Sequence, residues 1–330
     1  MPGIFEMEKN TLQHYVPQFI LNGFIEKESN QLFVFDKLEK KEFKVITRYI
    51  AAENGFYDLD LPDVIFSIDP GLSELESRTS SIIKEIVSKS SIESISEEDH
   101  YILAVFVASQ HLRTKQFRNY LVDLDKQFAS KLQTMGIDPF KIENYRPYEN
   151  DDEVKIDSMR MLSHQSMEIA RVIKSHNWYL IHTTDKSPFI ISDNPVVLYN
   201  EKKSSLMGTI GFAVPGIEIY YPLTKSLALY VSCKSNFERF YQQEQELDIL
   251  KNESANKDLL SLIEGKLKVI EKFKNMNTIE AIPEIVLHQN SLQVFYSERW
   301  LFSSNGDFNL VKEMLNKNVE LKHGPRTHIT

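Results

Sequence analysis

The stretch "LQHYVPQFILNGF", residues 12–24, places a histidine and a tyrosine directly before a short apolar run. Pro17 suits the first turn of a helix and Gly23 suits its end, so "PQFILNG" predicts a short helix. His14 and Tyr15 then lie at the positive end of that helix, a position that favours an anion and lowers the pKa of an imidazole. His14 is therefore a candidate acid or base and Tyr15 a candidate substrate contact. The alternative is a structural role, in which His14 is a core histidine whose ring bonds to the backbone. This arrangement is the more common one.

A second group of polar residues lies within residues 97–133, which predict one near-continuous helix without an internal Pro or Gly. At 100° per residue, Gln110 falls at the centre of the apolar stripe of this helix, and Arg113 falls on its border. A buried amide without a partner costs about 1–3 kcal/mol, so either a polar network or a ligand must satisfy Gln110. Arg113 adds a planar fork that suits a carboxylate or a phosphate. Both residues are candidates for substrate binding.

The segment "PFIISDNPVVLY" interrupts an apolar strand with a polar turn. Asp193 either holds an Asx-turn there or projects its carboxylate from the strand end into a cleft, with Asn194 beside it as a substrate contact. Glu53, and Glu74 with Glu76, are typical of helix-terminal acids unless the fold gathers them near His14 or Asp193. In that case Asp193 with Glu53 or Glu76 could hold a divalent metal ion.

We expect His14, Arg113 and Asp193 to meet in one cluster that lines the main cleft, because polar groups paired separately in a core are costly. Gln110 and Glu53 are expected at the edge of this cluster. Three functions fit it. The first is hydrolysis of a phosphodiester in nucleic acid or a nucleotide, as in a bacterial defence or toxin-type nuclease, with His14 as acid or base, Asp193 and Glu53 as its catalytic carboxylates, and Arg113 on the phosphate. The second is a sensor for a small anionic ligand, and the third is a non-catalytic protein with a buried polar network.

Composition narrows these choices. The 330-residue chain is 42% hydrophobic, which excludes general disorder, and its net charge of −9 argues against a surface that wraps duplex DNA. Cys233 is the only cysteine, so a disulfide framework and a thiolate zinc site are excluded. The first residues lack the pattern of a secretory signal, and the apolar runs are shorter than the roughly 20 residues of a membrane span. We therefore expect a soluble, cytoplasmic protein that does not bind a membrane.

Helical patterns dominate after about residue 70, and short strand patterns occur on both sides of them. We predict an α+β fold, predominantly helical, with a small mixed or antiparallel sheet. The chain is expected to form a single domain over 1–330, with an N-terminal sub-lobe over 1–70 and a hinge loop over 145–155 as its subdivisions. The predicted strands are 31–38, 42–50, 55–59, 178–184, 188–200, 217–232 and a final pair within 292–303.

Several segments also carry a family resemblance. In chain order they are "HYVPQFILNGF", "VFDK", "AAENGFYD", "LSELESR", "SQHLRTKQFR", "FIISDNPVV" and "HQNSLQVFYSERWLF". Together they resemble the bacterial and fungal domain-of-unknown-function family 4238, from about Leu12 to Phe302. The His-Tyr-Val-Pro opening and the Ser-Asp-Asn-Pro turn are the most specific parts. The resemblance implies a fold and a set of motif positions, and it implies no catalytic role because the activity of the family is unassigned.

Overall fold

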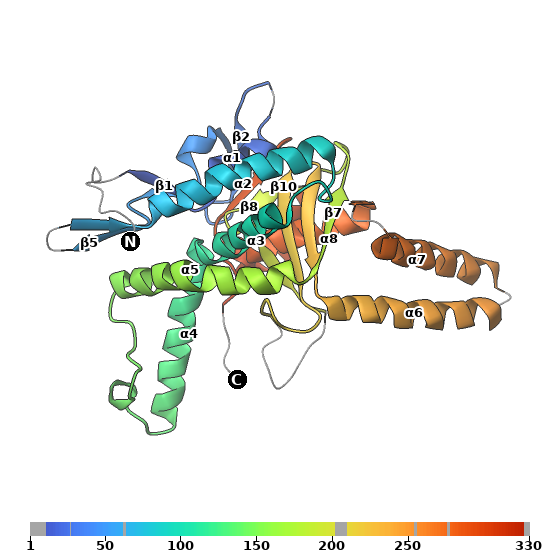
Figure 1. Cartoon of the computed structure of the whole chain (residues 1–330). Helices are drawn as coiled ribbons and strands as arrows, with labels where there is room; N and C mark the ends of the chain where they lie inside the picture. The colour runs from blue at the N-terminus through green and yellow to red at the C-terminus, as the bar shows by residue number, and fades with distance from the viewer. Residues whose placement is uncertain are drawn as a thin grey trace.

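The computed structural model describes residues 11–326, apart from residues 27, 62–63, 202–209, 254–255 and 276–277. Its elements confirm the predicted α+β class, in which helices predominate and the sheets are small (Figure 1). No helix in the described ranges is long and apolar enough to cross a membrane.

The helices form a packed group and two projecting parts (Figure 1). Their bounds are α1 (Gln18–Leu21), α2 (Asp69–Lys89), α3 (Glu97–Leu112), α4 (Lys115–Thr134), α5 (Asp151–Lys174), α6 (Lys234–Glu253), α7 (Lys257–Asn275), α8 (Pro283–Tyr296) and α9 (Asn309–Lys317). In the packed group, α3 lies against both α2 and α5. Most of α4 extends away from this group, and α6 and α7 extend together as an arm (Figure 1).

The central sheet of the described chain has five strands. Their spatial order is β12 (Thr278–Glu280), β7 (Asn177–His182), β11 (Leu227–Ser232), β10 (Glu218–Thr224) and β9 (Val197–Tyr199). β12 pairs with β7 in parallel and the other neighbours are antiparallel, so the sheet is mixed.

Helices cover both faces of this sheet. The ring of Tyr221 on β10 lies 6.2 Å from Phe106 of α3, whereas the ring of its neighbour Tyr220 lies 5.7 Å from His288 of α8. Successive side chains of a strand point to opposite faces, so α3 packs on one face and α8 on the other. The main apolar core lies between these layers and includes side chains from the N-terminal segment, α3 and the central sheet.

A second sheet joins the two ends of the chain. Its strands, in spatial order, are β3 (Lys41–Val45), β2 (Leu32–Asp36), β13 (Trp300–Ser303) and β8 (Ile191–Ser192). The N-terminal strand β2 pairs with the C-terminal strand β13 along its length. Two ribbons complete the described strands, β1 (Leu12–His14) with β4 (Ala52–Asn54) and β5 (Asp58–Leu61) with β6 (Val64–Ser67).

The predicted single helix over 97–133 is wrong, because α3 ends at Leu112 and α4 begins at Lys115. Thr114 causes the break. Its hydroxyl accepts a hydrogen bond from the backbone N–H of Phe117 at 3.2 Å and so caps a new helix. α4 then runs in a different direction from α3 (Figure 1). The apolar stripe alone does not predict this bend, because both α3 and α4 bury apolar side chains close to Thr114.

Two strand predictions are also wrong. Residues 292–296 continue α8, in which the buried side chains Val286, Gln289 and Gln293 recur every three or four residues, the period of a helix. Only the second member of the predicted pair within 292–303 is a strand, β13. Within the predicted strand 55–59, residues 55–57 form the turn between β4 and β5, where Gly55 has a φ of +59°, and only residues 58–59 belong to a strand, β5. The predicted loop over 145–155 is shorter than expected, since Asn150 caps α5 and the helix begins at residue 151.

Candidate functional site

His14 is positioned by a strand. It ends β1, opposite Ala52 of β4, and its imidazole is half-buried with Nε2 3.3 Å from the carbonyl oxygen of Thr47. The helix predicted after it is α1, whose four residues form barely one turn, so a helix dipole contributes little at His14. Burial lowers the pKa of His14 below its usual 6.5. The ring is therefore mostly neutral at pH 7.

Gln110 is buried, which confirms the prediction from the stripe. Its Nε2 donates to the carbonyl oxygen of Tyr15 at 2.8 Å, and its Oε1 accepts from Nε of Arg113 at 3.0 Å. The amide therefore links the chain beside His14 to the end of α3. Both of its ends have protein partners, which supports the network alternative for this residue.

Arg113 is buried and bonds to a side chain that is only partly exposed. Its Nη1 donates to Glu76 of α2 at 2.7 Å, and its side chain is only 1% exposed. Within the described part of the chain, Nη2 of Arg113 and the hydroxyl of Tyr221 are buried without a hydrogen-bond partner. The charges of Arg113 and Glu76 both act on the pKa of Tyr221 and of His14, which places the four side chains in one neighbourhood. We call His14, Glu76, Gln110, Arg113 and Tyr221 the Arg113 cluster.

The cluster has an outer and an inner layer. His14 and Glu76 are partly exposed, whereas Arg113 and Tyr221 are buried. Tyr57 connects the two layers, because its hydroxyl lies 3.3 Å from the carbonyl oxygen of His14 and 3.5 Å from that of Arg113. The Arg113 cluster therefore combines two partly exposed acid–base side chains with two buried side chains that each keep a donor without a hydrogen-bond partner.

Three other predicted residues, Tyr15, Glu53 and Asp193, line a cleft of about 620 Å³. We call it the Lys115 cleft after the lysine on its wall. Lys115 forms an ion pair with Glu53, and burial lowers the pKa of Lys115. On the same wall, the guanidinium of Arg118 lies 3.6 Å from the ring centroid of Phe56. The lining of the cleft includes both acidic and basic side chains, and its Lys115 and Glu53 are already paired with each other.

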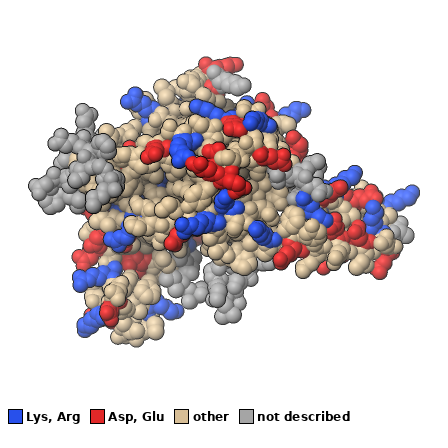
Figure 2. All heavy atoms as spheres, viewed as in Figure 1, with Lys and Arg blue, Asp and Glu red and all other residues tan. Residues whose placement is uncertain are grey.

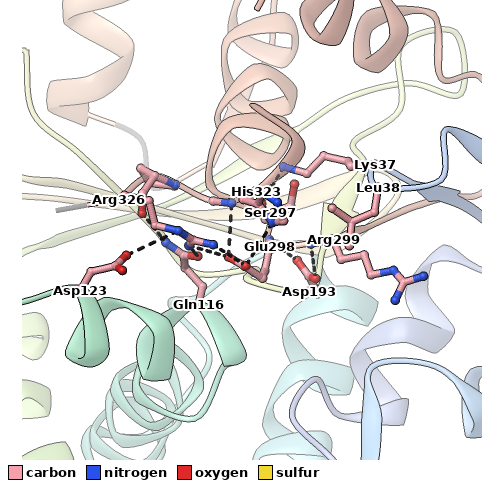
Figure 3. A network of polar contacts seen from close by, with 12 residues as sticks. Lys37, Leu38, Gln116, Asp123, Asp193, Ser297, Glu298, Arg299, His323 and Arg326 are labelled. Atoms are coloured by element: carbon pink, nitrogen blue, oxygen red, sulfur yellow. Dashed lines mark hydrogen bonds and ion pairs between the residues drawn. The ribbon is translucent and has the colours of Figure 1, made fainter. Parts of the chain in front are cut away.

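Asp193 holds the turn that precedes β13 (Figure 3). Its Oδ1 accepts from the backbone N–H of Glu298 at 2.8 Å, and its Oδ2 accepts from those of Arg299 at 2.7 Å and Trp300 at 2.9 Å. Burial raises the pKa of Asp193 to about 6, against the three amides, which favour the ionised form. A carboxylate with three backbone partners stabilises a loop, so the geometry supports the turn-holding role.

Lys37 holds the same turn from the opposite side (Figure 3). Its Nζ is fully buried and donates to the carbonyl oxygens of Val294 at 3.1 Å and Ser297 at 2.6 Å, at the end of α8. Asn194 adds a third connection, since it accepts from the Thr114 hydroxyl at 3.2 Å and donates to Tyr296. These polar groups join α8 to the segments that surround it.

The comparisons with known proteins assign a family. The model of a family described as a protein of unknown function, DUF4238, matches residues 12–307. The chain belongs to the DUF4238 family. No curated protein and no solved structure matches this family member. The predicted family is thus confirmed.

The structure divides the predicted site into two groups. His14, Gln110 and Arg113 belong to the Arg113 cluster, whereas Asp193 and Glu53 line the Lys115 cleft together with Tyr15. Tyr15 contributes to both, through its carbonyl oxygen and its ring respectively. The catalytic roles predicted for Asp193 and Glu53 stay predictions.

The sequence assigns Glu76 only a conditional role, as a possible metal ligand, and does not indicate Tyr221 at all. The apolar strand pattern around "EIYYPL" gave no sign that one of two adjacent tyrosines meets a buried arginine. No group of three or more His, Cys, Asp or Glu side chains in the described residues is arranged to hold a metal ion. The side chains predicted as metal ligands, Asp193, Glu53 and Glu76, belong to the two different groups.

Proposed function

We propose that the Arg113 cluster binds a phosphate group and that the protein hydrolyses a phosphodiester in a nucleotide or nucleic acid. One observation carries this proposal. A buried arginine and a buried tyrosine each keep a donor without a hydrogen-bond partner, in a cluster that also contains a partly exposed histidine and a partly exposed glutamate.

Electrostatics supports an anionic ligand. Arg113 uses Nε on Gln110 and Nη1 on Glu76, which leaves the Nη2 edge of its guanidinium for another acceptor. Each buried donor without a partner costs about 1–3 kcal/mol, so Nη2 and the Tyr221 hydroxyl both gain from an acceptor oxygen. A phosphate presents several such oxygens, and the planar arginine fork recognises them well.

His14 supplies the chemistry in this proposal. Its neutral imidazole takes a proton from water while the water oxygen forms a bond to phosphorus. The bond from phosphorus to the leaving oxygen breaks, and the imidazolium returns the proton to that oxygen, which balances the reaction. Arg113 stabilises the charge on the non-bridging oxygens. No step passes through a metal ion.

A sensor without turnover is the second candidate, because the same donors would bind a small anion that no group attacks. The two candidates share the binding site and differ only in the reaction. The third function, a structural network, is favoured only for Gln110, because both the Nε2 and the Oε1 of its amide have protein partners.

Calorimetric titration with inorganic phosphate and a nucleoside monophosphate tests binding. Release of nitrophenol from bis(para-nitrophenyl) phosphate and cleavage of a short single-stranded oligonucleotide, each with and without Mg²⁺, test hydrolysis. We expect His14→Gln to lower kcat by about 10²–10⁴-fold while phosphate affinity is kept. Arg113→Lys should weaken phosphate binding at least about tenfold, because the fork is lost. His164→Gln, which changes an exposed histidine of α5, is the matched control.

The pH profile adds a second criterion. Because the pKa of His14 lies below 6.5, kcat should be constant near pH 7 and should fall as acid protonates the imidazole. Phosphate binding without turnover would support the sensor and contradict hydrolysis. Absence of phosphate binding to the folded wild type would overturn both.

A further inference from the structure

The arm formed by α6 and α7 exposes large apolar side chains along its length. The two helices run antiparallel, since Lys251 pairs with Glu264 near the tip and Lys274 pairs with Glu244 near the base. A groove of about 1010 Å³ lies along them. The large apolar residues of the arm that are at least 40% exposed are Tyr241, Ile249, Leu250, Leu259 and Leu262. Such a row on a projecting element is typical of an interaction surface.

The two helices of the arm differ in charge. Acidic side chains exceed basic ones on α6, and basic ones exceed acidic ones on α7; Figure 2 shows both signs along the arm. The acidic residues of α6 are Glu238, Glu244, Glu246, Asp248 and Glu253, and the lysines of α7 include Lys257, Lys266, Lys268 and Lys274. Glu246 and Lys266 both line the groove.

We propose that two copies of this chain associate through their arms, with α6 of one copy on α7 of the other. A two-fold axis along the arm brings each acidic helix onto a basic one, so the arm is complementary to itself. The half-exposed Leu250 and Leu262 then enter the shared core of a four-helix bundle. The self-complementary charge selects a second copy over an unrelated helical partner.

Light scattering after size exclusion measures the mass directly, against 38.4 kDa for one chain. At about 100 µM, an interface with a Kd of about 10 µM is largely occupied, so the wild type should have twice that mass. Leu262→Glu should give a monomer. Met135→Glu is the matched control, because Met135 is 65% exposed at the end of α4 and lies off the arm. Circular dichroism checks that each variant is folded.

Charge reversal tests the specific arrangement. Glu246→Lys or Lys266→Glu alone places like charges across the interface and should weaken the dimer at least about tenfold, whereas the double variant should restore it. A monomeric wild type at this concentration would overturn the proposal and would leave the arm to a different partner. A dimer that Leu262→Glu does not affect would also overturn it, because the copies would then meet elsewhere.

Discussion

Replacement of Gln110 by leucine keeps the approximate volume of the side chain and removes both of its hydrogen bonds. The carbonyl oxygen of Tyr15 and Nε of Arg113, at 2.8 and 3.0 Å from the amide, then lose their partner in a dry environment. Each unpaired group costs about 1–3 kcal/mol, and the charged one lies at the upper end of that range. The apolar surface of leucine offsets about 1 kcal/mol of this loss. We expect the free energy of unfolding to fall by about 2–4 kcal/mol.

Urea unfolding of Gln110→Leu, followed by both tryptophan fluorescence and circular dichroism, measures this loss, because coincident transitions justify a single free energy. Gln133→Leu makes the same chemical change at an exposed position of α4 and should alter stability by less than about 0.5 kcal/mol. A loss below about 1 kcal/mol for Gln110→Leu would refute the network. Unchanged stability together with lost phosphodiesterase activity would instead show that the amide serves a ligand.

Two further changes address the turn before β13. Asp193→Asn replaces an oxygen that accepts two backbone amides by an NH₂ group, so urea unfolding at pH 8 should show a loss of about 3–5 kcal/mol, and an equally stable variant would contradict the turn-holding role. Burial lowers the pKa of Lys37 to about 8 from 10.5, so the folded chain binds fewer protons than the unfolded chain between these values. Wild-type stability should therefore gain about 3 kcal/mol from this residue as pH rises through that window. Lys37→Met should lack this gain, and parallel pH profiles of the two proteins would contradict it.

Local sequence patterns predicted much of this fold. The α+β class, the central strands and the burial of Gln110 follow from hydrophobic period and are confirmed. The hydrophobic pattern does not predict the break at Thr114, because a single hydroxyl that caps a new helix leaves the apolar stripe unchanged. The pattern also favours a strand at the end of α8, because a few consecutive apolar residues fit both the helical and the strand period.

Convergence of distant residues was harder to predict. Contact between Arg113 and Glu76 depends on how α2 packs against α3, and contact of either with Tyr221 depends on which face of β10 turns to α3. Lys37 resembles an ordinary strand-end lysine, yet it is buried because the turn after α8 lies over it. Such contacts are set by tertiary packing, which a single sequence does not encode locally.

The pairing of β2 with β13 has a consequence for how the chain folds during synthesis. Asp36 and Arg299, which form an ion pair at this junction, are 263 residues apart. At about 5–20 residues per second, a ribosome needs roughly 13–50 s to make the intervening chain. Until then one edge of β2 has no partner and is open to pairing with other nascent chains. Each newly made molecule thus passes through a long interval in which chaperones have reason to bind its N-terminal region, and a message truncated before residue 300 yields a product that never leaves that state.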